Sequence, residues 1–176
     1  MTTRGFAVTD IQGSARLWDR LGSSFAPLLA EHNRILLEAS GAHGGRVLRR
    51  EGDSFSFSFP DGASALRCAG TILSDLHAHP WPEEGGELRV RIGVHAGSVE
   101  SGREEDCQAL RLAGMVAAAA HGGQILASDD ASAAGSAQGL LKLDLGFHRL
   151  APGAPPVRLL QWLPPALASR RFPPPR

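Results

Sequence analysis

Residues 54–59 read Ser-Phe-Ser-Phe-Ser-Phe, the strictest periodic pattern in the chain. Successive side chains of a β-strand point to opposite faces, so this alternation predicts a strand with one aromatic, buried face. A second strand-like run, residues 46–49, precedes it, and Gly52 and Asp53 lie between the two. A Gly-Asp pair between strands is a common hairpin signal. The chain is therefore expected to build a sheet whose phenylalanine face another layer covers.

Helical and strand-like segments alternate along the rest of the chain. Apolar residues recur every three or four positions over 15–38, with Pro27 as a break or second helix start, and again over 63–77 and 108–120. Residues 5–9, 88–94 and 124–127 indicate further strands, and 140–150 with 157–163 indicate a closing hairpin. The order βα(α)ββαβ, then αβ and ββ, predicts an α+β sandwich with helices on one face of the sheet.

Size and composition favour one reduced, cytoplasmic domain. The 176 residues, 43% of them hydrophobic, suffice for one core, which we assign to residues 1–163, with a Pro/Arg-rich tail or linker at 164–176. Eighteen basic and eighteen acidic side chains cancel, which disfavours a nucleic-acid partner. Cys68 and Cys107 form no zinc-ligand spacing and no disulfide framework. The apolar runs are shorter than a membrane span, and no signal peptide is expected.

Two aspartates stand where short strands meet turns. Asp10 follows the apolar run 5–9, and Asp53 precedes the Ser/Phe strand. Carboxylates at the ends of neighbouring strands provide the hard oxygen ligands that allow Mg²⁺ or Mn²⁺ to be shared with a substrate triphosphate. The alternative is local, because an aspartate after a strand often caps a helix or shapes a turn. The residues by themselves leave both interpretations open.

Four motifs taken together resemble the catalytic domain of class III adenylate/guanylate cyclases. They are Thr-Asp-Ile-Gln-Gly-Ser at 9–14, Gly-Asp-Ser-Phe at 52–55, Val-Arg-Ile-Gly-Val-His-Ala-Gly at 90–97 and Ala-His-Gly-Gly-Gln-Ile-Leu at 120–126. They occur in the order that the family has, and the likeness extends over about residues 6–163. The resemblance implies a ferredoxin-like domain that pairs head to tail, as a homodimer or heterodimer, with nucleotide sites in the dimer cleft.

The resemblance also assigns roles to the first two motifs. Asp10 and Asp53 match the carboxylates that bind two Mg²⁺ or Mn²⁺ ions, with the backbone carbonyl of Ile11 as a further ligand. The turn into the first helix would offer backbone N–H groups to the phosphates of ATP or another purine nucleoside triphosphate. That turn comprises Gln12, Gly13, Ser14 and Ala15. Simple N-capping by Ser14 is the alternative for the turn.

The helix expected at 108–120 departs from the pattern of active relatives. Those relatives carry Asn-x-x-x-Arg, in which the asparagine orients the ribose and the arginine stabilises charge on the transferring phosphoryl group. Here Arg111 stands at the asparagine position and Met115 at the arginine position. Losing such an arginine costs about 10³–10⁵ in rate. The domain is therefore predicted to be catalytically impaired, unless the Arg111 side chain reaches about 6 Å along the helix and replaces the missing arginine.

Other nucleotide-contacting positions of the family are altered or ambiguous. The purine-selecting lysine and aspartate correspond to Arg49 and Glu104, which keep the charge and change the geometry. His148 and Arg149 fall where the family commonly supplies a cation for the triphosphate, although a solvated strand face explains them equally well. The choice between ATP and GTP stays open on this basis.

Three functions follow from the sequence. The first is a cyclase-type domain in cyclic-nucleotide signalling that keeps its metal and nucleotide ligands but turns over slowly or not at all as a homodimer. The second is an active adenylate cyclase that converts ATP to cAMP and pyrophosphate, through Arg111 or a heterodimer partner. The third is a non-enzymatic dimerisation scaffold. Metal-dependent ATP binding separates the first from the third, and product formation separates the first from the second.

Overall fold

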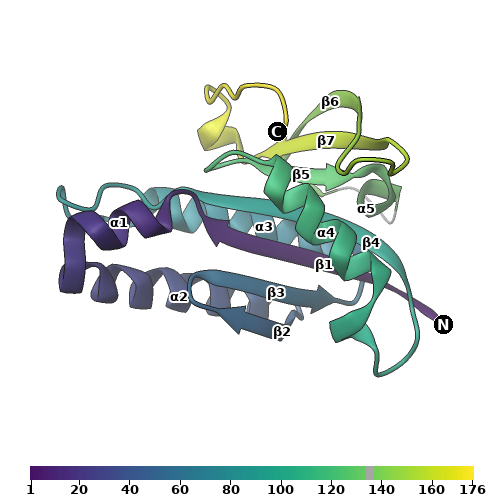
Figure 1. The fold of residues 1–176 in the computed structure, drawn as a ribbon, viewed down its shortest axis with the longest axis horizontal. Coiled ribbons are helices and arrows are strands. Elements are labelled where there is room, and N and C mark those ends of the chain that lie inside the picture. The colour runs from purple at the N-terminus through teal and green to yellow at the C-terminus, as the bar shows by residue number, and fades with distance from the viewer. Residues whose placement is uncertain (134–136) are drawn as a thin grey trace.

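The computed structural model describes residues 1–133 and 137–176. The central element of the described fold is one β-sheet. Its seven described strands lie in the order β2-β3-β1-β4-β5-β7-β6 (Figure 1). Neighbouring strands are antiparallel except β4 and β5, which are parallel. The strands are β1 (Thr2–Ile11), β2 (Arg46–Glu51), β3 (Ser54–Phe59), β4 (Val90–Val99), β5 (Ile125–Ser128), β6 (Leu141–His148) and β7 (Val157–Leu163).

Helices cover both faces of this sheet. Figure 1 shows α4 (Gln108–Ala119) in front of β1 and β4, and α3 (Gly62–Ala78) behind them. Helix α2 (Phe25–Ala42) shares the α3 side, where the phenylalanines of β3 are buried. The shorter elements are α1 (Ser14–Leu21), α5 (Asp129–Ala133), η1 (Gly22–Ser24), η2 (Glu104–Asp106) and η3 (Pro165–Leu167). Within the described ranges, no helix has the length and apolar composition that crossing a bilayer requires.

The predicted α+β, ferredoxin-like order with an added C-terminal αβ unit and hairpin is confirmed. The prediction that helices lie on one face only is wrong. Alternate residues of β4 face α4, and Gly93 and Gly97 stand on that side; a Cβ added at Gly93 would overlap the Ala113 carbonyl and lie 2.5 Å from Ala117 Cα. The missing side chains allow α4 to approach the strand closely. The alternation of apolar and polar residues did not predict a helix on this face, because glycine counts as neither apolar nor polar.

The helical region after β1 divides at Gly22, earlier than the predicted break at Pro27. Gly22 has a φ of +52°, in the left-handed region that favours glycine, and it ends α1. Pro27 instead occupies the third position of α2. A proline is tolerated there because the first N–H groups of a helix have no partner within it.

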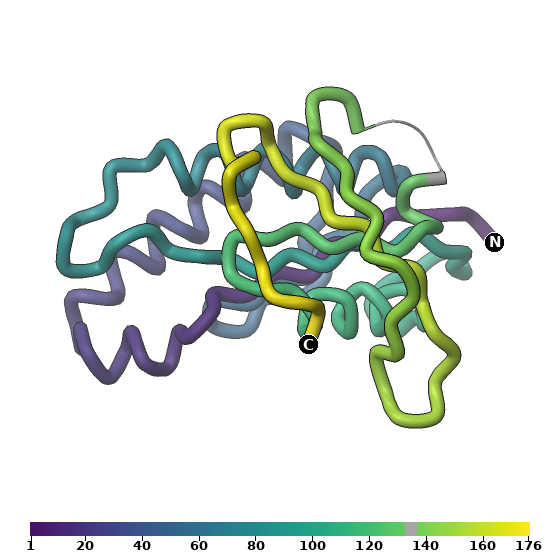
Figure 2. The backbone as a smooth tube through the Cα atoms, turned by 90° about the horizontal axis from the view of Figure 1, so that it is seen from above, coloured from purple at the N-terminus to yellow at the C-terminus, as the bar shows by residue number. Residues whose placement is uncertain are grey.

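Residues 164–176, predicted to be a tail or linker, fold back across the domain (Figure 2). Leu167 is buried, and Arg170 forms an ion pair with Glu87 at 2.5 Å. Further on, the backbone N–H of Arg176 donates to the Ala119 carbonyl at 3.0 Å. The domain boundary at residue 163 stays a prediction, but in this structure the segment beyond it makes specific contacts with the sheet and α4.

Candidate functional site

Asp10 and Asp53 meet at the end of strand β1. In the β1–β3 register Thr9 lies opposite Phe55, so β1 leaves this ladder beside the turn that precedes β3. There the backbone N–H of Ile11 donates to Asp53 Oδ2 at 2.7 Å. Asp10 immediately precedes Ile11 in the chain. Two carboxylates found in separate motifs are thus placed on either side of one backbone segment.

Arg91, which the sequence reasoning missed, stands on the other side of Asp10. The β1–β4 register places the two residues directly opposite each other. Arg91 Nε donates to Asp10 Oδ1 at 2.6 Å, and a terminal nitrogen donates to Oδ2, so the pair is bidentate. The hydrogen bonds to Asp10 raise the pKa of Arg91. In an alternating strand such an arginine resembles an ordinary outward-facing residue, and only the strand register shows its partner.

The turn after β1 presents backbone N–H groups. Gly13 has a φ of +75° and occupies the N-cap position of α1, and no side chain accepts a hydrogen bond there. Ser14 and Ala15 open the helix, so the alternative of N-capping by Ser14 is not what the structure has. An uncapped N-terminus leaves N–H groups available to an anion. Gln12 Oε1 accepts a hydrogen bond from the backbone N–H of Gly122, which ties this turn to the segment before β5.

Arginines surround the same turn. Arg16, Arg20 and Arg89 line a cavity of about 490 Å³ next to Gln12 and Gly13. Gln12 N–H donates to the carbonyl of Arg89 at 2.9 Å, so the prediction that this N–H is open to a phosphate is wrong, and the strand pairing of Asp10 with Arg91 continues to Arg89. Basic side chains and free N–H groups together favour an anion with several charges.

Arg111 and Met115 lie one turn apart on α4, the helix that covers the Phe6 and Val8 face of β1. Arg111 is 65% exposed, and its terminal nitrogen donates to Asp106 Oδ1 at 2.8 Å. Met115 is half-buried. Phe6 and Val8 pack in the cluster that α4 covers, so Asp10, two residues on from Val8, belongs to the same face of β1. Within the described residues, no hydrogen bond or ion pair joins Arg111 to Asp10.

The two purine-selecting positions are close to one strand without pairing. Glu104 Oε2 lies 3.3 Å from a terminal nitrogen of Arg46, and the Glu104 side chain is only 13% exposed. Arg49 is 4.0 Å from Glu51 instead. Arg46, at the start of β2, was not singled out from the sequence. The structure therefore brings Glu104 to β2 but gives it a different arginine.

His148 and Arg149 lie at the opposite edge of the sheet. Three strands separate β6 from β1, a distance of about 19 Å between the strand axes. His148 Nε2 is 2.9 Å from the Leu145 carbonyl, and Arg149 donates to the Ala154 carbonyl at 2.8 Å. One chain by itself does not bring these residues to Asp10 and Asp53.

Two histidines are buried in the layers around the site. His32, on α2, is fully buried near Phe55, and its Nδ1 contacts Asn33 Oδ1 at 2.9 Å. His95, on β4, is 2.6 Å from Ser128 Oγ. Burial lowers the pKa of both histidines, chiefly because an imidazolium loses its hydration there. Both side chains therefore belong to the packed interior.

The donor set at the end of β1 fits a divalent cation. Asp10, Asp53 and the Ile11 carbonyl supply hard oxygen atoms, the ligands that Mg²⁺ and Mn²⁺ prefer. Within the described residues, no group of three or more His, Cys, Asp or Glu side chains gathers anywhere, so the remaining ligands of an ion would come from backbone, nucleotide or water. The Arg91 guanidinium already occupies both oxygens of Asp10, and an incoming cation must compete with it.

Comparison with known proteins points to one class, although no protein-family profile matches the chain. An adenylate cyclase of Mycosarcoma maydis is 32% identical over 149 residues, which cover 69% of this chain and 6% of that protein. An adenylate cyclase structure from Trypanosoma brucei, in its monomeric state, aligns over 100% of this chain and 93% of its own, with a TM-score of 0.86 and 20% identity. The catalytic core of a rhodopsin-guanylyl cyclase of converted specificity, in complex with ATPαS, aligns over 92% and 95% with a TM-score of 0.79 and 15% identity.

The fold is that of class III adenylate/guanylate cyclase catalytic domains, and curated relatives that the sequence matches are named adenylate cyclase. This chain is a cyclase homology domain of that class. It spans only about 6% of the length of the first fungal adenylate cyclases that it matches.

Proposed function

We propose that this domain binds a purine nucleoside triphosphate with divalent metal ions at Asp10 and Asp53, and that as a homodimer it turns over slowly or not at all. The observation that carries the proposal is the junction at Ile11, whose N–H holds Asp53 at 2.7 Å next to Asp10. This junction leads directly into the uncapped N-terminus of α1. Carboxylates and phosphate-binding N–H groups are thus adjacent, as a metal–triphosphate complex requires.

The residues around the junction divide the work of binding. Asp10 and Asp53 hold the metal, which when bound lowers the pKa of the ribose hydroxyl and neutralises triphosphate charge. The Gly13 turn donates backbone N–H groups to the phosphates. Arg91 exchanges its carboxylate partner for a phosphate, a charge-assisted bond of the same bidentate kind. Arg49 and Glu104 would contact the purine edge.

Catalysis is where we expect the domain to fail. Met115 supplies no charge to the transition state, and Arg111 is exposed and paired with Asp106. The resemblance to class III cyclases implies a site built between two protomers, so we propose a cytoplasmic homodimer, or a heterodimer whose partner supplies the missing pair. Sedimentation at high micromolar concentration tests the homodimer: a strictly monomeric species, with and without nucleotide, would favour a heteromeric partner.

Calorimetric titration with a non-hydrolysable ATP analogue tests the binding site. The analogue should bind with Mn²⁺ and lose at least about tenfold in affinity without it or in Asp10→Asn and Asp53→Asn, since charged hydrogen bonds and metal ligands are lost. Asp75→Asn, an exposed aspartate on α3, is the matched control and should change nothing. Equal binding with and without Mn²⁺ would show that the assignment is wrong.

A scaffold without ligands is the second candidate, and the Arg91 pair favours it. Both oxygens of Asp10 are satisfied by Arg91 without any metal. A domain of this kind would dimerise with no nucleotide dependence. Dimerisation with no detectable analogue binding in Mn²⁺ would support it over the first proposal.

A further inference from the structure

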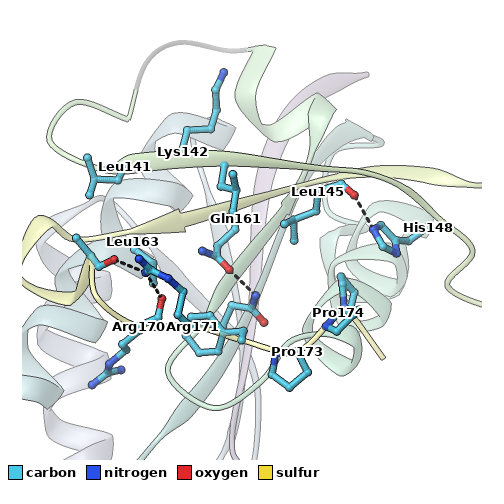
Figure 3. A pocket seen from close by; sticks show the side chains of 15 residues that line it. Leu141, Lys142, Leu145, His148, Gln161, Leu163, Arg170, Arg171, Pro173 and Pro174 are labelled. Carbon is cyan, nitrogen blue, oxygen red and sulfur yellow. Dashed lines mark hydrogen bonds between the residues drawn. The ribbon is translucent and has the colours of Figure 1, made fainter.

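A second cavity, of about 580 Å³, lies between the β6–β7 hairpin and the C-terminal segment (Figure 3). Its volume is within the range of about 300–1,000 Å³ that is typical of small-molecule sites. Leu141 and Leu143 of β6 are 50% and 55% exposed, and Leu145 follows on the same strand. The opposite wall is apolar too, and consists of Phe172, Pro173, Pro174 and Pro175. The cavity is thus an apolar track between a strand and an extended segment.

The wall on the side of the tail is fixed by specific contacts. His121 Nε2 donates to the Pro174 carbonyl at 3.0 Å, and the rings of His121 and Phe172 are stacked with centroids 6.5 Å apart. The Arg176 N–H bond to Ala119 closes the far end of the segment. The cavity is therefore largely formed without a ligand, which lowers the entropy cost of binding.

The charged side chains that line the cavity are basic. Within the described residues that line it, basic side chains occur and acidic ones do not. Arg170 is neutralised by Glu87, and Figure 3 shows Lys142 pointing away from the cavity, where its amine stands over the Trp162 ring. Arg171 differs, since its terminal nitrogen donates only to the carbonyls of Ala168 (2.9 Å) and Arg170 (3.1 Å). Arg171 therefore faces the cavity without a carboxylate partner among the described residues.

We propose that this cavity binds a free fatty carboxylate, with its chain along Leu141, Leu143 and Leu145 and its headgroup on Arg171. From Leu141 to Leu145 the strand rises at most about 13 Å, since its pairing is irregular between Asp144 and Gly146, and an extended chain of about ten carbons fills that length. Covering the exposed leucines removes apolar surface from water, and a carboxylate gives Arg171 the bidentate partner it lacks. The proposal does not depend on nucleotide binding, because the site lies on β6 and β7 at the other edge of the sheet from Asp53.

Titration of the full chain with decanoate tests the site, with decanol and decyltrimethylammonium as ligands of equal chain length. Decanoate should bind saturably with one molecule per chain, and the other two should bind at least about tenfold more weakly, because only the carboxylate bonds Arg171. Arg171→Gln should weaken decanoate by a similar factor, and Leu143→Asp should abolish binding. Arg103→Gln, an exposed arginine outside the cavity, is the matched control. Decanoate should also slow trypsin cleavage after Arg170.

Each other result overturns the proposal in a distinct way. Equal binding of decanol shows that the headgroup is not recognised. A loss in Arg103→Gln equal to that in Arg171→Gln shows only a general charge effect. Binding to anionic vesicles without binding of monomeric decanoate identifies a membrane surface, and a concentration-dependent dimer that Leu143→Asp dissociates identifies a second copy of the chain. If binding does not saturate at decanoate concentrations up to the millimolar range, the cavity is not a fatty carboxylate site.

Discussion

Arg91 and a metal ion compete for Asp10, so Arg91→Gln should tighten the binding of bare Mn²⁺. Two unit charges 4 Å apart interact by about 1 kcal/mol in water and about 4 kcal/mol at an effective dielectric constant of 20. The Arg91 and Asp10 side chains are 21% and 34% exposed, so the interaction lies between these limits. We take about 2 kcal/mol, which corresponds to roughly a thirtyfold gain in Mn²⁺ affinity.

The assay is a titration with Mn²⁺ in the absence of nucleotide, with free Mn²⁺ followed by its paramagnetic resonance. Arg89→Gln is the matched control because Arg89 is two residues earlier and its described contacts include no ion pair with Asp10. With an ATP analogue added, the order should reverse, and Arg91→Gln should bind it more weakly than the native chain. Unchanged or weaker Mn²⁺ binding in Arg91→Gln would refute the competition.

Three further predictions address catalysis, pH and packing. Arg111→Asn combined with Met115→Arg should raise the rate of ATP cyclisation by at least about a hundredfold, and Arg111→Asn by itself should not. If the native chain turns over near 1 s⁻¹ and Arg111→Ala abolishes that activity, Arg111 is instead a relocated catalytic cation. Burial lowers the pKa of His32, so the unfolded chain binds the proton more tightly, and stability is lost as pH falls below about 6.5, by at most about 1.4 kcal/mol per pH unit. In urea unfolding, the loss of stability between pH 7.5 and pH 5.5 should be smaller in His32→Leu than in the native chain. An equal loss in both chains would exclude His32 as the cause. Gly93→Ala should destabilise the fold by about 2 kcal/mol or more because its Cβ meets the α4 backbone, and thermal unfolding close to that of the native chain would contradict the tight contact.

The proximity of Asp10 and Asp53 was predictable because both stand where short strands meet turns, whereas metal binding by them stays a prediction that the family resemblance supplied. Asp10 ends an apolar run and Asp53 follows a turn glycine, and the antiparallel pairing of β1 with β3 then brings the two motifs together. The Ser/Phe strand was equally legible, since period two is a property of the strand itself. Features that depend on one strand or turn and its immediate neighbours were therefore predictable from the sequence.

Arg91 and the path of residues 164–176 were not predictable, for a different reason. The partner of Arg91 is fixed by cross-strand register, which joins positions far apart in sequence. The tail has a composition typical of a linker, and only tertiary contacts such as Arg170 with Glu87 hold it on the domain. Arg111 and Met115 were located by their spacing from the following glycines, yet the pairing of Arg111 with Asp106 required the fold.

The close approach of α4 to β4 at Gly93 bears on how far residue exchanges on α4 disturb the fold. The helix is positioned by backbone contact with the strand, so its place does not depend on the side chains that point away from the sheet. Exchanges at the exposed position 111 should therefore cost little folding stability. The same backbone contact should keep positions 111 and 115 in place when Arg111→Asn and Met115→Arg are combined.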